Sequence, residues 1–211
     1  MLQHLLYIVS TPIGNLEDMT LRAIRTLKEV DYIAAEDTRH SAILLKKYEI
    51  KTPTISFHAH SGEQKLQKIL DLLKEGKKIA LISDAGTPGI SDPGYVLIRK
   101  AIEAGIKIVP IPGPSAFLTA LSASGLPTNT FLYIGFLPLK KGRKTLMASW
   151  KEEKRTIVFY ESPHRILRTL KELAEALGNR PVVIGRELTK IYEEIWRGNL
   201  VEATKYYEGR S

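Results

Sequence analysis

The stretch that decides the fold class is Ser83-Asp84-Ala85-Gly86-Thr87-Pro88-Gly89-Ile90-Ser91-Asp92-Pro93-Gly94. It follows the apolar run 79–82, which predicts a buried strand, and precedes residues 95–104, whose apolar spacing predicts a helix. A simple strand-to-helix loop needs only about 2 to 6 residues and far less glycine and proline. Glycine lets a ligand approach the backbone, and proline fixes the path of the chain. Because ligands of open α/β sheets bind outside the carboxyl ends of strands, the stretch predicts a small-molecule site; a surface turn is the alternative.

Two further loops rich in glycine and proline follow predicted strands. Ser10-Thr11-Pro12-Ile13-Gly14-Asn15 comes after a strand expected at residues 4–9, and residues 110–116 come after a strand expected at 106–111. The first of these loops lacks the ending of a phosphate-binding Walker loop and is not a GxGxxG motif. In the second, Pro114 suits the first turn of a helix, which leaves two amides near its positive end. Three such loops in one half of the chain indicate a shared role.

The alternation of strands and helices predicts an α/β fold with a mostly parallel sheet. A chain of 211 residues suits two domains of about 100 residues each. We place the boundary after the second loop's strand, which gives an N-terminal α/β domain at residues 1–112 and a C-terminal α/β domain at residues 113–211.

Composition limits the possible functions. The sequence has no cysteine, which excludes disulfides, thiolate nucleophiles and cysteine-ligated metals. Its 31 basic and 23 acidic residues give a net charge of +8, which favours a polyanionic partner such as nucleic acid. No apolar run approaches the ~20 residues of a membrane span, and the N-terminus lacks the pattern of a signal peptide. We therefore expect no membrane association and a cytoplasmic protein.

Charged clusters follow two more predicted strands of the first half. Glu36-Asp37-Thr38-Arg39-His40 comes after a strand at residues 32–35, and it could either meet a substrate or cap the next helix through Asp37 or Thr38. His58 and His60 follow a short strand at residues 54–57, with a spacing able to hold a metal if the strand continued. With no third ligand in the pattern, we expect substrate contacts or surface residues and no metal.

The second half contains a dense basic run. Seven lysines and arginines fall within sixteen residues, opposed only by Glu152 and Glu153: Lys140, Lys141, Arg143, Lys144, Lys151, Lys154 and Arg155. The run is the best candidate in the chain for binding the phosphates of a nucleic acid. A solvated helix face is the alternative interpretation.

Two polar clusters follow predicted strands of the second half. Glu161-Ser162-Pro163-His164-Arg165 comes after residues 156–160, with Ser162 expected to cap a helix that begins at Pro163. Arg186-Glu187-Leu188-Thr189-Lys190 comes after residues 181–185. A further strand at residues 191–196 and a final amphipathic helix at residues 199–207 complete the prediction.

In these motifs the sequence resembles the tetrapyrrole methylase superfamily, and within it the group that methylates small-subunit ribosomal RNA. Six motifs carry the resemblance in the family's order across nearly the whole chain: residues 10–15, 35–39, 83–94, 112–116, 159–165 and 186–190. Ile13 stands where corrin-type members have proline, which favours the ribosomal RNA group. That group commonly continues past the second domain with another strand and a small helical segment, whereas this sequence ends at Ser211.

The resemblance implies two α/β domains of the tetrapyrrole methylase type, with S-adenosylmethionine in a cleft between them, in a homodimer. It implies 2′-O-methylation of a cytidine ribose in small-subunit ribosomal RNA, either naked or in the assembled subunit. By position it implies the following cofactor contacts: Pro12, Ile13, Asp84, Ala85, Gly86, Thr87, Pro88, Ile90, Ser115, Ala116, Glu161, Leu188 and Thr189.

The chemistry of methyl transfer adds one hypothesis. A neutral ribose hydroxyl is a poor nucleophile, so a group of the protein must accept its proton. Glu36, Asp37, His58, Glu161 and Glu187 are candidates, and we expect Glu36 or Asp37 to accept the proton while Arg39 holds phosphate. We expect RNA binding by Lys140, Lys141, Arg143 and Lys144.

Two alternatives remain open at this stage. One is a methylase of the same fold acting on a tetrapyrrole or another small molecule or on a protein side chain, and the other is a non-catalytic RNA-binding protein that retains the cofactor. The basic run argues against the first, because a small-molecule methylase has no need of salt-sensitive phosphate contacts.

Overall fold

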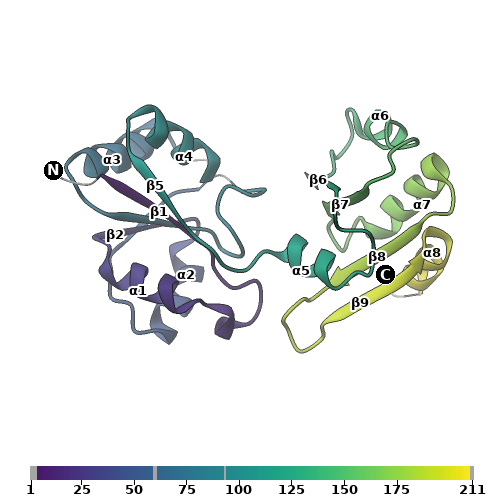
Figure 1. Ribbon diagram of the computed structural model, residues 1–211, viewed down its shortest axis with the longest axis horizontal. Helices are drawn as coiled ribbons and strands as arrows, with labels where there is room; N and C mark the ends of the chain where they lie inside the picture. Colours follow the sequence, from purple (N-terminus) through teal and green to yellow (C-terminus); the bar gives the residue numbers. More distant parts are fainter. Residues whose placement is uncertain (1–3, 59–60, 93, 210–211) are drawn as a thin grey trace. The chain divides into compact units, whose positions relative to one another are not determined.

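The computed structural model describes residues 4–58, 61–92 and 94–209. The chain forms two compact units, Met1–Ala116 (unit 1) and Phe117–Ser211 (unit 2). Each unit combines strands with helices, so the expected α/β class is confirmed (Figure 1).

Unit 1 is built on a five-stranded sheet with the order β3-β2-β4-β1-β5. All of its strand pairs are parallel, as the alternation of strands and helices predicts. The strands are β1 (Leu5–Val9), β2 (Tyr32–Ala35), β3 (Thr54–Ser56), β4 (Ile79–Ile82) and β5 (Lys107–Ile111). Because the strands are parallel, their carboxyl ends lie at one edge of the sheet, and the loops that follow them emerge there.

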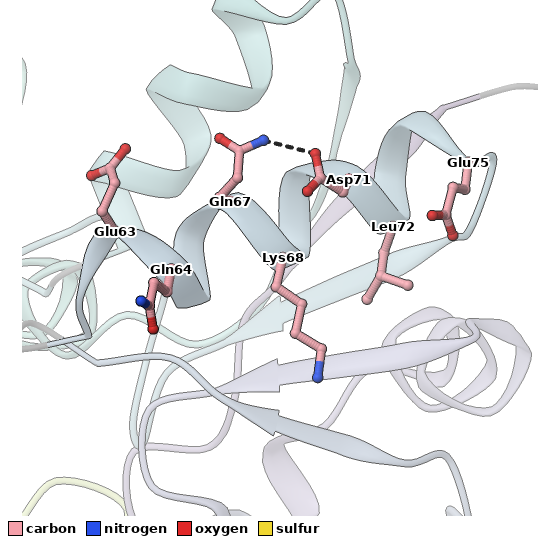
Figure 2. A pocket seen from close by; sticks show the side chains of 7 residues that line it. All are labelled: Glu63, Gln64, Gln67, Lys68, Asp71, Leu72 and Glu75. Carbon is pink, nitrogen blue, oxygen red and sulfur yellow. Dashed lines mark hydrogen bonds between the residues drawn. The ribbon is translucent and has the colours of Figure 1, made fainter.

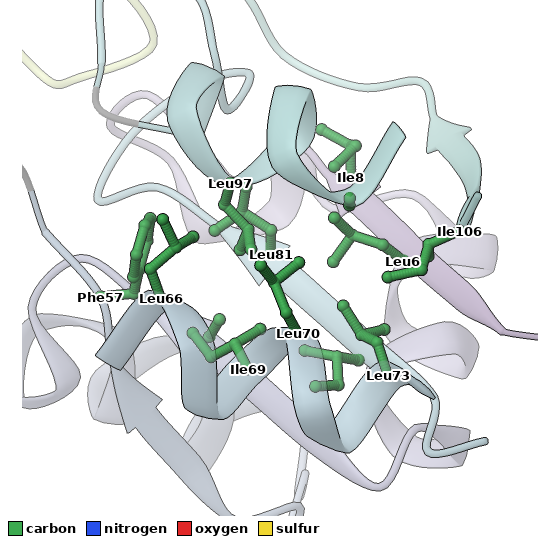
Figure 3. Close-up of a cluster of buried hydrophobic side chains, with 13 residues drawn as sticks. Leu6, Ile8, Phe57, Leu66, Ile69, Leu70, Leu73, Leu81, Leu97 and Ile106 are labelled. Atoms are coloured by element: carbon green, nitrogen blue, oxygen red, sulfur yellow. The ribbon is translucent and has the colours of Figure 1, made fainter. Parts of the chain in front are cut away.

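Helices cover both faces of this sheet. On one face α3 (Glu63–Lys74) and α4 (Gly94–Glu103) pack against β1 and β4, and Figure 3 shows this core. On the other face α1 (Leu21–Glu29) and α2 (Thr38–Lys47) pack against β1, β2 and β4. Each of these helices keeps an apolar stripe at helical spacing, such as Leu66, Ile69, Leu70 and Leu73 of α3, and that stripe faces the sheet.

Unit 2 contains two short sheets. Strands β6 (Phe131–Phe136) and β7 (Thr156–Tyr160) pair in parallel, and β8 (Pro181–Arg186) and β9 (Glu194–Asn199) pair antiparallel. Its core joins Trp150 and Met147 to apolar side chains of the longer helices. The helices are α5 (Ala116–Ser122), whose first residue belongs to unit 1, α6 (Arg143–Ala148), α7 (Ile166–Leu177) and α8 (Leu200–Glu208).

Two elements of unit 2 begin well after their predicted first residues. Helix α7 begins at Ile166 rather than at Pro163, because residues 163–165 form a turn in which Arg165 N–H donates to the Ser162 carbonyl. Strand β9 begins at Glu194 rather than at residue 191, because the chain first turns, with Glu193 N–H donating to the Lys190 carbonyl. In both places a turn occupies residues that the sequence had assigned to a regular element.

Candidate functional site

The loops after β1 and β4 are joined by their main chains. Thr11 and Gly86 exchange two hydrogen bonds, with N···O distances of 2.9 and 3.0 Å. The Thr11 hydroxyl also donates to the Ser83 carbonyl at 2.9 Å. Although β1 and β4 pair in parallel, this bridge is antiparallel, so it is a separate main-chain contact that fixes one loop against the other.

The loop after β5 is attached to the same assembly. The Thr87 hydroxyl donates to the Pro114 carbonyl at 3.1 Å and lies 2.9 Å from the Ser10 hydroxyl. A Cβ added at Gly113 would lie only 2.8 Å from the Cβ of Ser10, so the two loops meet where glycine has no side chain. The three loops predicted to share a role therefore form one connected structure, which we call the loop assembly.

The central loop is also braced internally. The Asp92 carboxylate accepts N–H bonds from Gly89 at 2.7 Å and from Gly94 at 2.8 Å. Burial raises the pKa of Asp92, although these two N–H groups lower it. Gly86 has φ +85°, a conformation that residues with a Cβ rarely adopt, and this explains the glycine at the bridge to Thr11. The loop is therefore held in one shape by its own hydrogen bonds.

The predicted cofactor contacts of unit 1 divide by exposure. Three are buried in the assembly (Pro12, Gly86 and Pro88), five are half-buried (Ile13, Asp84, Thr87, Ser115 and Ala116), and two are exposed (Ala85 and Ile90). The buried members shape the assembly, and the others offer main-chain and side-chain groups at its surface. All ten thus lie on one connected set of loops at the carboxyl edge of the sheet.

A group of acids adjoins the loop assembly at the ends of β2 and β4. The Asp84 carboxylate accepts the Asp37 N–H at 3.0 Å, while the Glu36 carboxylate accepts the Asp84 N–H. Burial, followed by the negative charges of Asp84 and Asp92, raises the pKa of Glu36, and His58 partly offsets the shift. The reciprocal bonds hold Glu36 beside the central loop in a setting that makes its carboxylate a better base.

The Asp37 carboxylate differs from the Glu36 carboxylate in its partners and in the direction of its pKa shift. Its carboxylate caps α2 by accepting the Arg39 N–H at 2.9 Å, as the capping alternative predicted, and it also pairs with the Arg39 guanidinium at 2.9 Å. The Arg39 hydrogen bonds lower the pKa of Asp37 to about 2, which makes it a weak proton acceptor. The Arg39 side chain is 90% exposed, so it can still reach a phosphate.

The strand end at Glu161 in unit 2 is closed by a buried charge network. The Glu161 carboxylate accepts bonds from Ser162 N–H and the Thr169 hydroxyl, and it pairs with Arg165 at 2.6 Å and with Arg143 at 3.5 Å. Its side chain is 3% exposed. These partners satisfy the Glu161 carboxylate within unit 2, so the geometry gives no support to a cofactor contact through that group.

Arg143 does not lie on the basic surface to which the sequence assigned it. Its guanidinium donates to Glu172 at 2.6 Å, to the Thr169 hydroxyl at 2.5 Å and to the Pro138 carbonyl at 3.1 Å, and its side chain is 4% exposed. The expectation that Arg143 binds RNA is therefore corrected: it is a buried structural residue. The signal was present, because Arg143, Met147 and Trp150 are spaced as one buried helical stripe.

The rest of the basic run is exposed. Lys140, Lys141 and Lys144 lie at the surface, as do Lys151 and Lys154. Arg155 instead pairs with Glu153 at 2.6 Å. The three lysines around the start of α6 thus remain available to an anionic partner.

The β8–β9 turn holds the last two predicted cofactor residues. Leu188 is buried and packs where Gly185 lacks a side chain. Thr189 has φ +67°, which is strained for a β-branched residue, and its hydroxyl is buried without a hydrogen-bond partner. Strain together with an unsatisfied hydroxyl is typical of a functional position, because a ligand group can supply the missing bond.

Other features of the described residues give weaker evidence for a functional site. Across residues 4–58, 61–92 and 94–209, no cluster of three or more His, Asp or Glu side chains could hold a metal, and His60 lies outside that set. A shallow groove follows the outer side of α3, where Gln67 donates to Asp71 at 2.7 Å (Figure 2). It is lined by that helix and Glu75 alone and includes none of the strand ends. The loop assembly is therefore the better candidate site.

Comparison with known proteins agrees with this geometry. The family model described as Tetrapyrrole (Corrin/Porphyrin) Methylases matches residues 5–204. The chain belongs to the tetrapyrrole methylase family. It is also 51% identical over 203 residues to the ribosomal RNA small subunit methyltransferase I of Thermotoga maritima, covering 96% of this chain and 91% of that protein. The protein of the same name from Halalkalibacterium halodurans is 56% identical, with 95% of this chain and 70% of that protein covered.

Solved structures of other methylases share the fold. A cobalt precorrin-4 methyltransferase of cobalamin biosynthesis matches with a TM-score of 0.71 at 19% identity, covering 98% of this chain and 90% of that chain. A uroporphyrin-III C-methyltransferase from Thermus thermophilus, complexed with S-adenyl homocysteine, matches with a TM-score of 0.64 at 19% identity, covering 96% and 86%. The predicted family and fold type are thereby confirmed.

The described part of this methylase contains no helix long and apolar enough to cross a membrane.

Proposed function

We propose that this methylase transfers the methyl group of S-adenosylmethionine to small-subunit ribosomal RNA, at the ribose 2′-hydroxyl of a cytidine. The observation that carries the proposal is the loop assembly. It occurs in a chain that is 51% and 56% identical in sequence to two proteins named ribosomal RNA small subunit methyltransferase I. The exposed lysines of unit 2 support a polyanionic substrate. We also propose that it acts in the cytoplasm as a homodimer.

The residues of the loop assembly fit an adenosyl ligand. Gly113 brings backbone to the surface without a side chain, and the central loop, which is bonded to that loop through Thr87, exposes Ala85 and Ile90. When bound, the cofactor supplies an electrophilic methyl group on a sulfonium. The protein's contribution is then to position the acceptor, which can account for about 7 to 11 kcal/mol of a barrier.

Glu36 is the proton acceptor that the geometry favours. With a methyl donor bound, the Glu36 carboxylate would accept the proton of the ribose hydroxyl as that oxygen becomes the nucleophile. Its raised pKa suits that role, since general bases work best when their pKa approaches the working pH. Asp37 is unsuited because Arg39 holds its pKa at about 2, and Glu161 because its carboxylate is enclosed.

The test is single-turnover methyl transfer to assembled small subunits with Glu36→Gln. We expect the rate to fall by about 10²- to 10⁴-fold, with affinity for cofactor and RNA retained. Asp37→Asn serves as the matched control, with a smaller loss. An unchanged rate for Glu36→Gln would refute the assignment, and salt-insensitive catalysis would instead favour a small-molecule acceptor.

A further inference from the structure

A row of five aromatic rings extends across one face of the β6–β7 sheet of unit 2. Successive ring centroids lie 6.2, 4.4, 5.9 and 5.3 Å apart, which places each pair in ring contact. The order of the rings is Phe131, Phe117, Tyr133, Tyr160 and Phe136. The rings come from α5, β6 and β7, so residues distant in sequence form one continuous surface, which we call the aromatic row.

An irregularity in β6 brings its last ring into the row. Side chains alternate between the faces of a strand, so Tyr133 and Phe136 would ordinarily lie on opposite faces. The pairing register with β7 shifts between Tyr133 and Gly135, and Gly135 has φ +72°. This bulge turns Phe136 onto the face of Tyr133 and Tyr160. The opposite face, with Ile134 and Phe159, packs into the core of unit 2.

The ends of the aromatic row are open and its centre is fixed. Phe136 is 56% exposed and Phe131 is 36% exposed, which is unusual for two large rings on one surface. In the centre, the Tyr160 hydroxyl accepts the Phe117 N–H at 3.2 Å. Burial raises the pKa of Tyr160 to about 12, still further above physiological pH than its ordinary value. The row is thus a rigid apolar surface with an accessible ring at each end.

Positively charged residues come soon after the last ring of the aromatic row in the sequence. Lys140, Lys141 and Lys144 come within eight residues of Phe136 in the sequence and are exposed. The carboxylate at the end of β7, Glu161, is 3% exposed and paired with Arg143 and Arg165, so it does not oppose them at the surface. Aromatic rings followed closely in the chain by exposed lysines are a combination suited to single-stranded nucleic acid, whose bases stack on rings and whose phosphates bind lysine.

We propose that the aromatic row is a stacking platform for an unpaired base of the RNA substrate, with Phe136 as the outer stacking ring and Lys140, Lys141 and Lys144 holding the neighbouring phosphates. This inference rests on the proposed function and names the part of the RNA that unit 2 receives. Sequence-selective RNA recognition favours unpaired bases, because only these expose a flat face for stacking.

The test is fluorescence anisotropy with a labelled single-stranded RNA of about 12 nucleotides, within the range of single-strand sites. We expect Phe136→Ala to weaken binding about tenfold, and Phe136→Trp to retain it because indole also stacks. Lys141→Ala should weaken binding and lower the salt slope by about 1, whereas Phe136→Ala leaves the slope unchanged. Leu139→Ala, which removes an apolar side chain 69% exposed, is the matched control without effect.

The outcomes separate this inference from the proposed function. If the wild type binds RNA and Phe136→Ala binds equally well, the platform is refuted and the proposed function stands. If the wild type binds neither this RNA nor small subunits, both fail. A loss of S-adenosylmethionine affinity in Phe136→Ala with RNA affinity intact, or dissociation of a dimer in sedimentation, would assign the row to the cofactor or to a second copy. Photocrosslinking of 5-iodouridine RNA to the Phe136 peptide would support the platform directly.

Discussion

The two units stabilise the ends of their strands in opposite ways. In unit 1 the Thr11–Gly86 bridge uses main-chain atoms, and a missing side chain at Gly113 lets a third loop join. In unit 2 the end of β7 depends on side chains, with Glu161 enclosed by Arg143 and its neighbours. A main-chain bridge tolerates many substitutions, whereas a buried charge network depends on each member, so the two units should differ in which substitutions harm them.

The largest expected effect comes from breaking the charge network. Arg143→Ala leaves Glu161 and Glu172 short of a buried partner, and we expect unit 2 to lose about 3–5 kcal/mol of its free energy of unfolding. Urea unfolding followed by tryptophan fluorescence measures it, since both tryptophans, Trp150 and Trp196, lie in unit 2.

Arg168→Ala is the matched control for that variant. Arg168 pairs with the same Glu172 but is 65% exposed, so we expect a loss below about 1 kcal/mol. Equal losses in the two variants would show that burial of Arg143 is not what makes the network costly to break.

The second expected effect comes from crowding the loop assembly. Gly113→Ala places a Cβ against Ser10, and we expect a loss of about 1–3 kcal/mol in unit 1 together with weaker cofactor binding. Amide hydrogen exchange of β1 and β5 and calorimetric titration of S-adenosylmethionine measure the two parts.

Gly62→Ala is the control for Gly113→Ala, because it adds a Cβ without a close contact. An added Cβ at Gly62 meets nothing within 4 Å, and its φ of −64° suits alanine. We expect nearly unchanged exchange and cofactor affinity. Full cofactor affinity in Gly113→Ala would contradict the claim that close contact of the loops shapes the site.

A third, smaller effect concerns Glu36. Its pKa is raised in the folded protein, so its ionised form is disfavoured there and stability falls as pH rises from the ordinary pKa through the folded one. Glu36→Gln removes this penalty, and we expect unit 1 to be slightly more stable than wild type at pH 7, by less than Gly113→Ala destabilises it, and not at pH 4. Hydrogen exchange at both pH values checks the sign, and a loss at pH 7 would contradict it.

The smallest effect tests one exposed ion pair in each unit. Arg39 lowers the pKa of Asp37 to about 2, and Arg155 does the same for Glu153. The stability each pair contributes is present above the ordinary carboxyl pKa near 4 and is lost as pH falls towards 2. We expect Asp37→Asn and Glu153→Gln each to match wild type at pH 7 in high salt. A large change in either would mean that the pair is less solvated than its exposure indicates.

The sequence predicted the loop assembly well because glycine and proline report directly on backbone shape. Parallel strands place their carboxyl ends at one edge, so loops around Gly86 and Gly113 could be expected to meet there. The hydrogen bonds that join Glu36 and Asp37 to Asp84 could not be expected, because they depend on which strands are neighbours in the sheet rather than on chain order.

The residues of unit 2 were harder to place for a different reason. Charge density alone assigned Arg143 to the surface, whereas the apolar stripe it shares with Met147 determines which way it faces. Glu161 looked available because its partners Arg143 and Thr169 are distant in the chain and lie near it only after α6 and α7 pack. Burial of a charge depends on tertiary partners, and local sequence does not specify them.

The bulge in β6 decides which face of the sheet displays Phe136. Two residues separate Tyr133 from Phe136, and regular alternation over that spacing would send the Phe136 ring to the core side. A strand of the same length that lost the bulge, for example because a side chain at position 135 disfavoured its positive φ, would therefore exchange what faces solvent for what faces the core. Deletion of one of the two intervening residues would remove the bulge and still leave both rings on one face. In relatives of this chain, the number of residues between these two positions has to be considered together with the bulge to tell whether the ring is displayed.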